Sequence, residues 1–273
     1  MRKIAFSMII AVALAAGPAY AQEREAEIIQ NSAKVLTEMQ AMPDLQVPDW
    51  LLQRAQGIAI LPEVVKAGAF VGGRGGTGVL LVRQSEGDWS NPLFIGIGAG
   101  SIGWQFGVQA ADVVLVFTTR KSIEGITDGK ITLGGDASAV AGPVGRSAAA
   151  ATSVTLDAEI YSYSRAKGLF AGVSLEGSVL FIRDSANERF YGKSHVIASE
   201  IIAPGTPLAP EPAPALIQEV ARITSAAPAA GGAAPAAPEA AATTPAAAAP
   251  PTTPPADAQT FPMADPNPGA EPN

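Results

Sequence analysis

The spacing of apolar positions changes along the chain, and each change predicts a different kind of segment. An apolar run, 4–16, follows a basic start, and residues 23–54 repeat their apolar positions at helical spacing. After Gly57 the apolar residues form short runs or alternate with polar ones, as they do in strands. Large apolar residues become rare from residue 205 onward. The pattern therefore predicts a leader, a pair of helices, a β-rich region and a tail.

Residues 1–21 have the features of a secretory signal peptide. Arg2 and Lys3 precede the apolar run, and Ala19-Tyr20-Ala21 follows it as a small-x-small cleavage site. The run is shorter than the roughly 20 residues that span a bilayer, which disfavours the alternative of a membrane anchor. We expect cleavage near Ala21 and a periplasmic or secreted mature protein.

Two helices are expected before the β-rich region. Apolar residues between Ile28 and Met39 gather on one helical face. Met42-Pro43-Asp44 interrupts this pattern, and Pro48 stands ahead of a second helical start.

The β-rich region reads as strands joined by short connections. Strands are expected at 57–61, 78–83, 93–97, 102–108, 112–118, 131–133, 159–163, 168–175 and 178–183, with a glycine-rich turn after Val71 and a helical turn at 120–128. No helices of 10–15 residues separate these strands, which favours antiparallel pairing over βαβ units. The expected fold class is α+β: N-terminal helices packed on a glycine-rich, mainly antiparallel β-sandwich or partial barrel, with a disordered C-terminal tail.

The chain is expected to have three parts: a signal peptide at 1–21, a folded domain at 22–204 and an Ala/Pro-rich tail at 205–273. The tail has too few large apolar residues to offset the entropy of ordering it. Residues 213–224 are the exception, because their apolar residues recur at helical spacing and predict a short docking helix. The remainder is expected to act as a passive tether, with a ligand for a Pro-reading domain as the alternative.

Composition excludes several kinds of site. The 273 residues include no cysteine and one histidine, and the net charge is −7. Disulfides, thiol nucleophiles and multi-histidine metal sites are therefore excluded, and no cofactor is expected. The acidic balance argues against nucleic acid as a partner.

No motif indicates an enzyme. Two G-x-G-x-x-G matches, 73–78 and 98–103, are each followed by a strand-like segment instead of the helix that a dinucleotide site requires. His195 lies in a polar stretch and is expected to be exposed and structural. The acid pair Asp157 and Glu159 leaves a hydrolase as a minor alternative, and that alternative requires a cleft with two facing carboxylates.

Basic residues in the β-rich region form the candidate binding site. Several flank glycine-rich turns, and if they converge at one end of the sheet they can hold an anionic lipid headgroup. The candidates are Lys66, Arg74, Arg120, Lys121, Arg146, Arg165 and Lys167. The alternative is that they are ordinary solvated charges.

Several segments in series resemble the SYLF domain family. They are 55–80, 89–98, 103–107, 114–117, 134–137, 141–146 and 161–174, so that the likeness covers roughly residues 30–200. The resemblance implies lipid binding without catalysis: eukaryotic members bind phosphoinositides, yeast members also bind actin, and secreted bacterial members are described as lipid-binding. Eukaryotic members engage membranes with a basic N-terminal helix, whereas the segment from Glu23 to Glu27 is acidic here.

The sequence thus predicts a non-enzymatic lipid-binding or membrane-surface-binding protein of the cell envelope. Its expected partner is a phospholipid or membrane surface, and actin is an improbable partner for a secreted protein. The alternative is a structural or protein-interaction module that binds another envelope protein and is tethered by the tail.

Overall fold

The computed structural model describes residues 17–68, 71–85, 87–102, 107–143, 158–167 and 175–225. The chain divides into two units, Met1–Gly231 and Gly232–Asn273, and every described residue lies in the first. Most of the expected signal peptide, all but the last residue of the expected strand at 168–175 and the tail after residue 225 lie outside the described residues.

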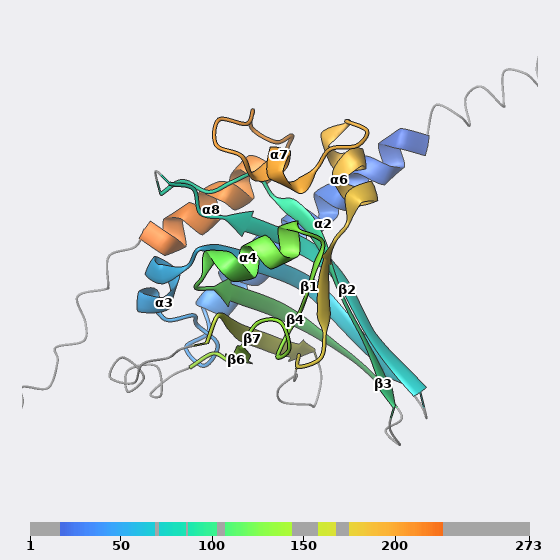
Figure 1. Cartoon of the computed structure of the whole chain (residues 1–273), viewed down its shortest axis with the longest axis vertical. Helices are drawn as coiled ribbons and strands as arrows, with labels where there is room; N and C mark the ends of the chain where they lie inside the picture. The colour runs from blue at the N-terminus through green and yellow to red at the C-terminus, as the bar shows by residue number, and fades with distance from the viewer. Residues whose placement is uncertain are drawn as a thin grey trace, which may run out of the picture. The chain divides into compact units, whose positions relative to one another are not determined.

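Six helices and eight strands are described (Figure 1). The helices are α2 (Gly17–Gln40), α3 (Asp49–Arg54), α4 (Arg120–Thr127), α6 (Asp184–Tyr191), α7 (Ala198–Ile202) and α8 (Ala213–Ser225). The strands are β1 (Gly57–Gly68), β2 (Val71–Val82), β3 (Leu93–Ile102), β4 (Gly107–Phe117), β5 (Lys130–Thr132), β6 (Ala139–Ala141), β7 (Ile160–Lys167) and β8 (Val179–Ile182). The break between the two N-terminal helices is confirmed, and Pro48 is the residue that caps α3.

All eight strands belong to one sheet, in the order β5-β8-β3-β2-β1-β4-β7-β6. Neighbours are antiparallel except β6 and β7, which are parallel. The two edge strands, β5 and β6, follow each other in the chain, and the short link between them can reach at most about 25 Å. Eight flat strands would separate the edges by about 34 Å. The sheet must therefore curl, and the expected α+β fold with a partial barrel is confirmed.

Apolar residues cover both faces of the sheet. On one face Ile58, Ile60 and Val114 pack under α2, α3, α6 and α8. On the other face Ala59, Leu61 and their neighbours pack against α4, α7 and the link between β5 and β6. Because successive residues of β4 enter both cores, the apolar run expected at 112–118 is a central strand, as its sequence indicates.

The glycine-rich segment after Val71 is a strand and not the expected turn. On one side β2 pairs with β1, from Gly72 to Val82. On the other side it pairs with β3. Glycine is required where these backbones approach: a Cβ on Gly78 would overlap the carbonyl oxygen of Ile60 and lie 2.7 Å from the Cα of Leu61. The two neighbouring ladders outweigh the turn propensity of glycine.

The alternating run at 102–108 is not one strand. β3 ends at Ile102 and β4 begins at Gly107, while residues 103–106 lie outside the described residues. The sheet order explains the difference, because β3 and β4 lie on opposite sides of the β1–β2 hairpin.

Helix α8 lies beyond residue 204, where the sequence analysis ends the folded domain. Leu216 and Val220 are fully buried on it, and the indole Nε1 of Trp89 donates a hydrogen bond of 3.0 Å to Thr224 Oγ1. The segment at 213–225 is thus a helix of the core, docked on α2 and α3.

Substitution of Gly78 should test whether β1 and β2 approach too closely there for a side chain. We expect Gly78→Ala to lower the free energy of unfolding by about 1–3 kcal/mol, because the new methyl group meets backbone atoms that cannot move aside. Gly100→Ala is the matched control, since a Cβ there has no atom within 4 Å. It should raise the free energy of unfolding by at most about 1 kcal/mol. Urea denaturation measures both, and equal effects would contradict the close approach of β1 and β2.

Candidate functional site

Two of the expected basic residues are direct neighbours. Lys66 on β1 is the register partner of Arg74 on β2, so that their side chains leave the sheet on the same face. Arg74 Nη1 donates to the hydroxyl of Ser178 at 3.0 Å, and its Nε is buried without a hydrogen-bond partner. Burial lowers the pKa of Arg74. No described carboxylate forms an ion pair with either side chain.

This pair has the chemistry of an anion site. Like charges directly opposite each other on adjacent strands repel, and the single hydrogen bond to Ser178 replaces only part of the hydration that the half-buried Arg74 guanidinium loses. A bound anion removes both costs. Lys66 and Arg74 are therefore the part of the candidate site that the fold assembles.

The opposite face of the same strand segments is apolar and exposed. We call residues 65–68 of β1, 72–75 of β2, 98–101 of β3 and 107–110 of β4 the distal strand ends; in Figure 1 they extend beyond the helices. Val65 is 37% and Val108 75% exposed on them. Glycine and alanine occupy most of the neighbouring positions, which leaves the two valines standing out from a flat surface.

Arg165 is held inside the protein by two carboxylates. Its Nη2 lies 2.7 Å from Oδ2 of Asp112, which is fully buried, and its Nη1 lies 2.7 Å from Oε2 of Glu38 on α2. The hydrogen bond to Asp112 is the main cause that raises the pKa of Arg165. Its charge is already compensated, so that this residue joins α2 to the sheet and is not available to a headgroup.

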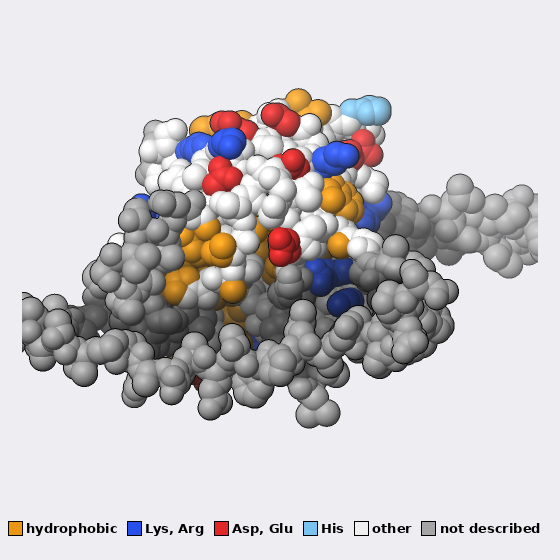
Figure 2. All heavy atoms as spheres, turned by 60° about the horizontal axis from the view of Figure 1, so that its bottom comes forward, with side chains coloured by type: hydrophobic (Ala, Val, Ile, Leu, Met, Phe, Trp, Pro, Cys, Tyr) orange, Lys and Arg blue, Asp and Glu red, His pale blue; other side chains and the backbone are white. Residues whose placement is uncertain are grey.

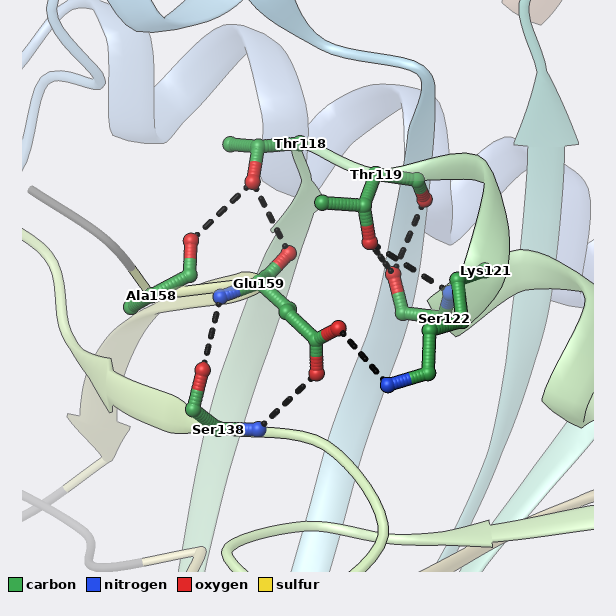
Figure 3. A network of polar contacts seen from close by, with 7 residues as sticks. All are labelled: Thr118, Thr119, Lys121, Ser122, Ser138, Ala158 and Glu159. Carbon is green, nitrogen blue, oxygen red and sulfur yellow. Dashed lines mark hydrogen bonds and ion pairs between the residues drawn. The ribbon is translucent and has the colours of Figure 1, made fainter.

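Lys121 is exposed but has an acidic partner, as Figure 3 shows. Its Nζ lies 3.5 Å from Oε1 of Glu159, whose Oε2 accepts a hydrogen bond from the backbone N–H of Ser138. The network links α4 to the edge formed by β6 and β7.

Arg120, the remaining candidate whose side chain is described, does not join Lys66 and Arg74. Arg120 donates through Nη2 to the carbonyl oxygen of Arg83, just beyond the other end of β2, about 30 Å along the strand from Arg74. Arg146 and the side chain of Lys167 lie outside the described residues. Figure 2 shows Lys and Arg side chains at several places on the described part of the face it presents, with acidic and apolar side chains between them.

Three residues that the sequence analysis did not select belong to these arrangements. Asp112 is the one that the sequence could have indicated, because it is the single charged residue of β4. Ser178 and Glu38 have none, since only the sheet order brings them beside Arg74 and Arg165.

Of the residues considered for catalysis, Asp157 lies outside the described residues and His195 lies on the surface. The side chain of His195 is 97% exposed, and its backbone N–H donates to Glu188. In the described ranges no three His, Cys, Asp or Glu side chains gather as metal ligands, and no helix is long and apolar enough to cross a membrane.

These features define a class: an α+β domain built on a curled, glycine-rich sheet. Comparison with known proteins gives the family. Residues 98–223 match the Ysc84 family, described as "Las17-binding protein actin regulator". The chain belongs to this SYLF domain family.

Relatives are found in animals and yeast. The chain is 36% identical over 179 residues to "SH3 domain-containing YSC84-like protein 1" of Xenopus laevis, covering 63% of this chain and 53% of the relative. It is 39% identical over 178 residues to "Protein YSC84" of Saccharomyces cerevisiae, covering 64% and 37%. The human YSC84-like protein is 35% identical over 184 residues, covering 65% and 53%. The chain thus spans about half or less of the length of these relatives, whose names describe no enzyme.

Removal of the Arg165 charge should be costly for stability. We expect Arg165→Met to lower the free energy of unfolding by about 3–5 kcal/mol, because the buried charge of Asp112 then loses the cation that forms its ion pair. Lys121→Met, which breaks an exposed ion pair, should cost less than about 1 kcal/mol. Adding Asp112→Asn to Arg165→Met should recover part of the loss. Denaturant titrations provide the values, and equal costs for the two single variants would show that the Asp112 charge is unimportant.

Proposed function

We propose that the domain is a non-enzymatic module that binds anionic membrane surfaces through the distal strand ends. One observation carries the proposal: Lys66 and Arg74 stand side by side without an acidic partner among the described residues, on strand ends whose other face exposes Val65 and Val108.

The two faces of these strands match the two layers of a membrane interface. Phosphate groups of anionic lipids offer partners for Lys66 and Arg74, while the acyl boundary offers an apolar environment for Val65 and Val108. Because the strand ends extend beyond the helices, both faces can enter the interface together (Figure 1). The flat surface of glycine and alanine allows close approach of lipid.

The sequence supports a location outside the cytoplasm. With a signal peptide cleaved near Ala21, the mature protein meets membranes from the periplasmic or outer side. We expect Edman sequencing or intact mass of protein purified from its own cells to give Gln22 as the first residue. An intact Met1 on protein found in the cytoplasm would contradict this location.

A protein partner is the second candidate function. The family match at 98–223 is described as "Las17-binding protein actin regulator", and the region runs from the end of β3 to α8, with α4, α6 and α7 between them. If this second function is the correct one, the partner is a protein such as an envelope component, and actin is one of the candidates.

Co-sedimentation with vesicles tests the lipid function. The full-length chain should sediment with phosphatidylglycerol vesicles and only weakly with phosphatidylcholine vesicles, and added salt should weaken the binding. Lys66→Gln with Arg74→Gln should reduce the affinity roughly 30-fold, since each cation contributes about 1 kcal/mol at an anionic surface.

The control keeps the same change in net charge. Lys34→Gln with Lys130→Gln removes two exposed cations from α2 and β5, and it should retain binding within about threefold. The proposal would be rejected if the chain sedimented with neither kind of vesicle. It would also be rejected if both double variants lost the same vesicle affinity. Capture of a specific protein under conditions without vesicle binding would favour the second candidate.

A further inference from the structure

A pocket of about 340 Å³ opens at the end of the sheet opposite the distal strand ends. It lies at the C-terminal end of β2, between the N-terminus of α4 and the segment formed by α7 and the residues after it. Its lining includes Val82, Gln84 and Ser85 from the β2 side, Arg120 from α4, and Ser199 and Ile202 from α7.

Hydrogen bonds hold the walls of this pocket in place. Gln84 Nε2 donates to the carbonyl oxygens of Ile202 and Ala203 at 3.1 and 3.3 Å, which fixes the end of α7 against β2. Arg120 Nη2 donates to Arg83 O at 2.9 Å, which fixes the guanidinium at the other wall. The pocket is thus formed before any ligand arrives.

The charge of the lining is positive. Two arginines, Arg83 and Arg120, belong to it, and its described lining includes no acidic side chain. Arg83 is anchored: its Nη2 donates to Leu52 O, its guanidinium lies 5.0 Å from the centroid of the Trp89 ring, and burial lowers its pKa. Neither arginine forms an ion pair within the described part of the chain.

Hydrogen-bond donors remain available for a ligand. An arginine has five N–H groups, and Arg120 uses one of them on Arg83. Ser85 and Ser199 also line the pocket, and their hydroxyls form no hydrogen bond with a described residue. Val82, Ile202 and Pro204 add an apolar part to the wall.

We propose that this pocket binds a small ligand with a phosphate or carboxylate group, held by Arg120 and the two serine hydroxyls, with its apolar part against Ile202. The volume lies at the lower end of the range for small-molecule sites, which suits a metabolite-sized ligand or one lipid headgroup. The site is separate from Lys66 and Arg74, because β2 places about 30 Å between them.

Isothermal titration calorimetry tests the site with glycerol 3-phosphate and inorganic phosphate, and with glycerol as the neutral control. The full-length chain should bind the two phosphates saturably and not bind glycerol. Arg120→Gln should weaken binding about tenfold or more, which is the value of one charge-assisted hydrogen bond.

Two control variants separate this site from its surroundings. Lys121→Gln removes the neighbouring charge, which does not line the pocket, and should bind phosphate within about twofold of the unaltered chain. Lys66→Gln with Arg74→Gln should also leave phosphate binding unchanged, whatever its effect on vesicles. The two sites can therefore fail independently.

A competition experiment decides whether the phosphate group belongs to a lipid headgroup or to a soluble ligand. Displacement of glycerol 3-phosphate by phosphatidic acid vesicles would identify a lipid headgroup as the ligand, and absence of displacement would identify a soluble ligand. Absence of saturable phosphate binding, or unchanged binding in Arg120→Gln, would overturn the proposal. An equal loss in Lys121→Gln would overturn it too, because binding would then follow general charge.

Discussion

One buried carboxylate connects three parts of this domain. Asp112 is fully buried on β4; its Oδ1 accepts a hydrogen bond from the backbone N–H of Glu63, and its Oδ2 binds Arg165 on β7. Arg165 reaches on to Glu38 of α2. A charge inside a core is tolerated only with good compensation, so β1, β7 and α2 must all take their native places together. The contacts of Arg165 with Glu38 and Asp112 thus fix the position of α2 on the sheet.

The same contact decides which way the candidate site faces. Glu63 belongs to a β-bulge, with φ of 57°, where β1 gains a residue relative to both neighbours. An extra residue reverses the inside–outside alternation of everything that follows it in the strand. Lys66 therefore lies on the face of Arg74, and Val65 lies on the opposite face. Without the bulge the two cations would point away from each other.

The sequence could predict those features that depend on local pattern. Helices α2 and α3 with the break at Met42-Pro43-Asp44, the central strand at 112–117, and the mainly antiparallel sheet follow from spacing and breakers alone. The glycine segment of β2 could not be predicted, because its strand form depends on pairing with β1 and β3. Nor could the site be predicted in full: Lys66 and Arg74 converge through the bulge and the strand register, whereas Arg165 and Lys121 are committed to acids distant in the sequence.

The brevity of the two edge strands has a consequence for crowding at a surface. β5 and β6 have three residues each, so that the two terminal strands of the described sheet offer little backbone to another copy of the chain. Long unprotected edges recruit neighbouring chains into intermolecular sheets. Proteins that accumulate on a membrane reach high local concentrations, and a chain rich in glycine and β-branched residues would be vulnerable there. Terminal strands of three residues lower this tendency, because each offers few backbone groups to a neighbouring chain.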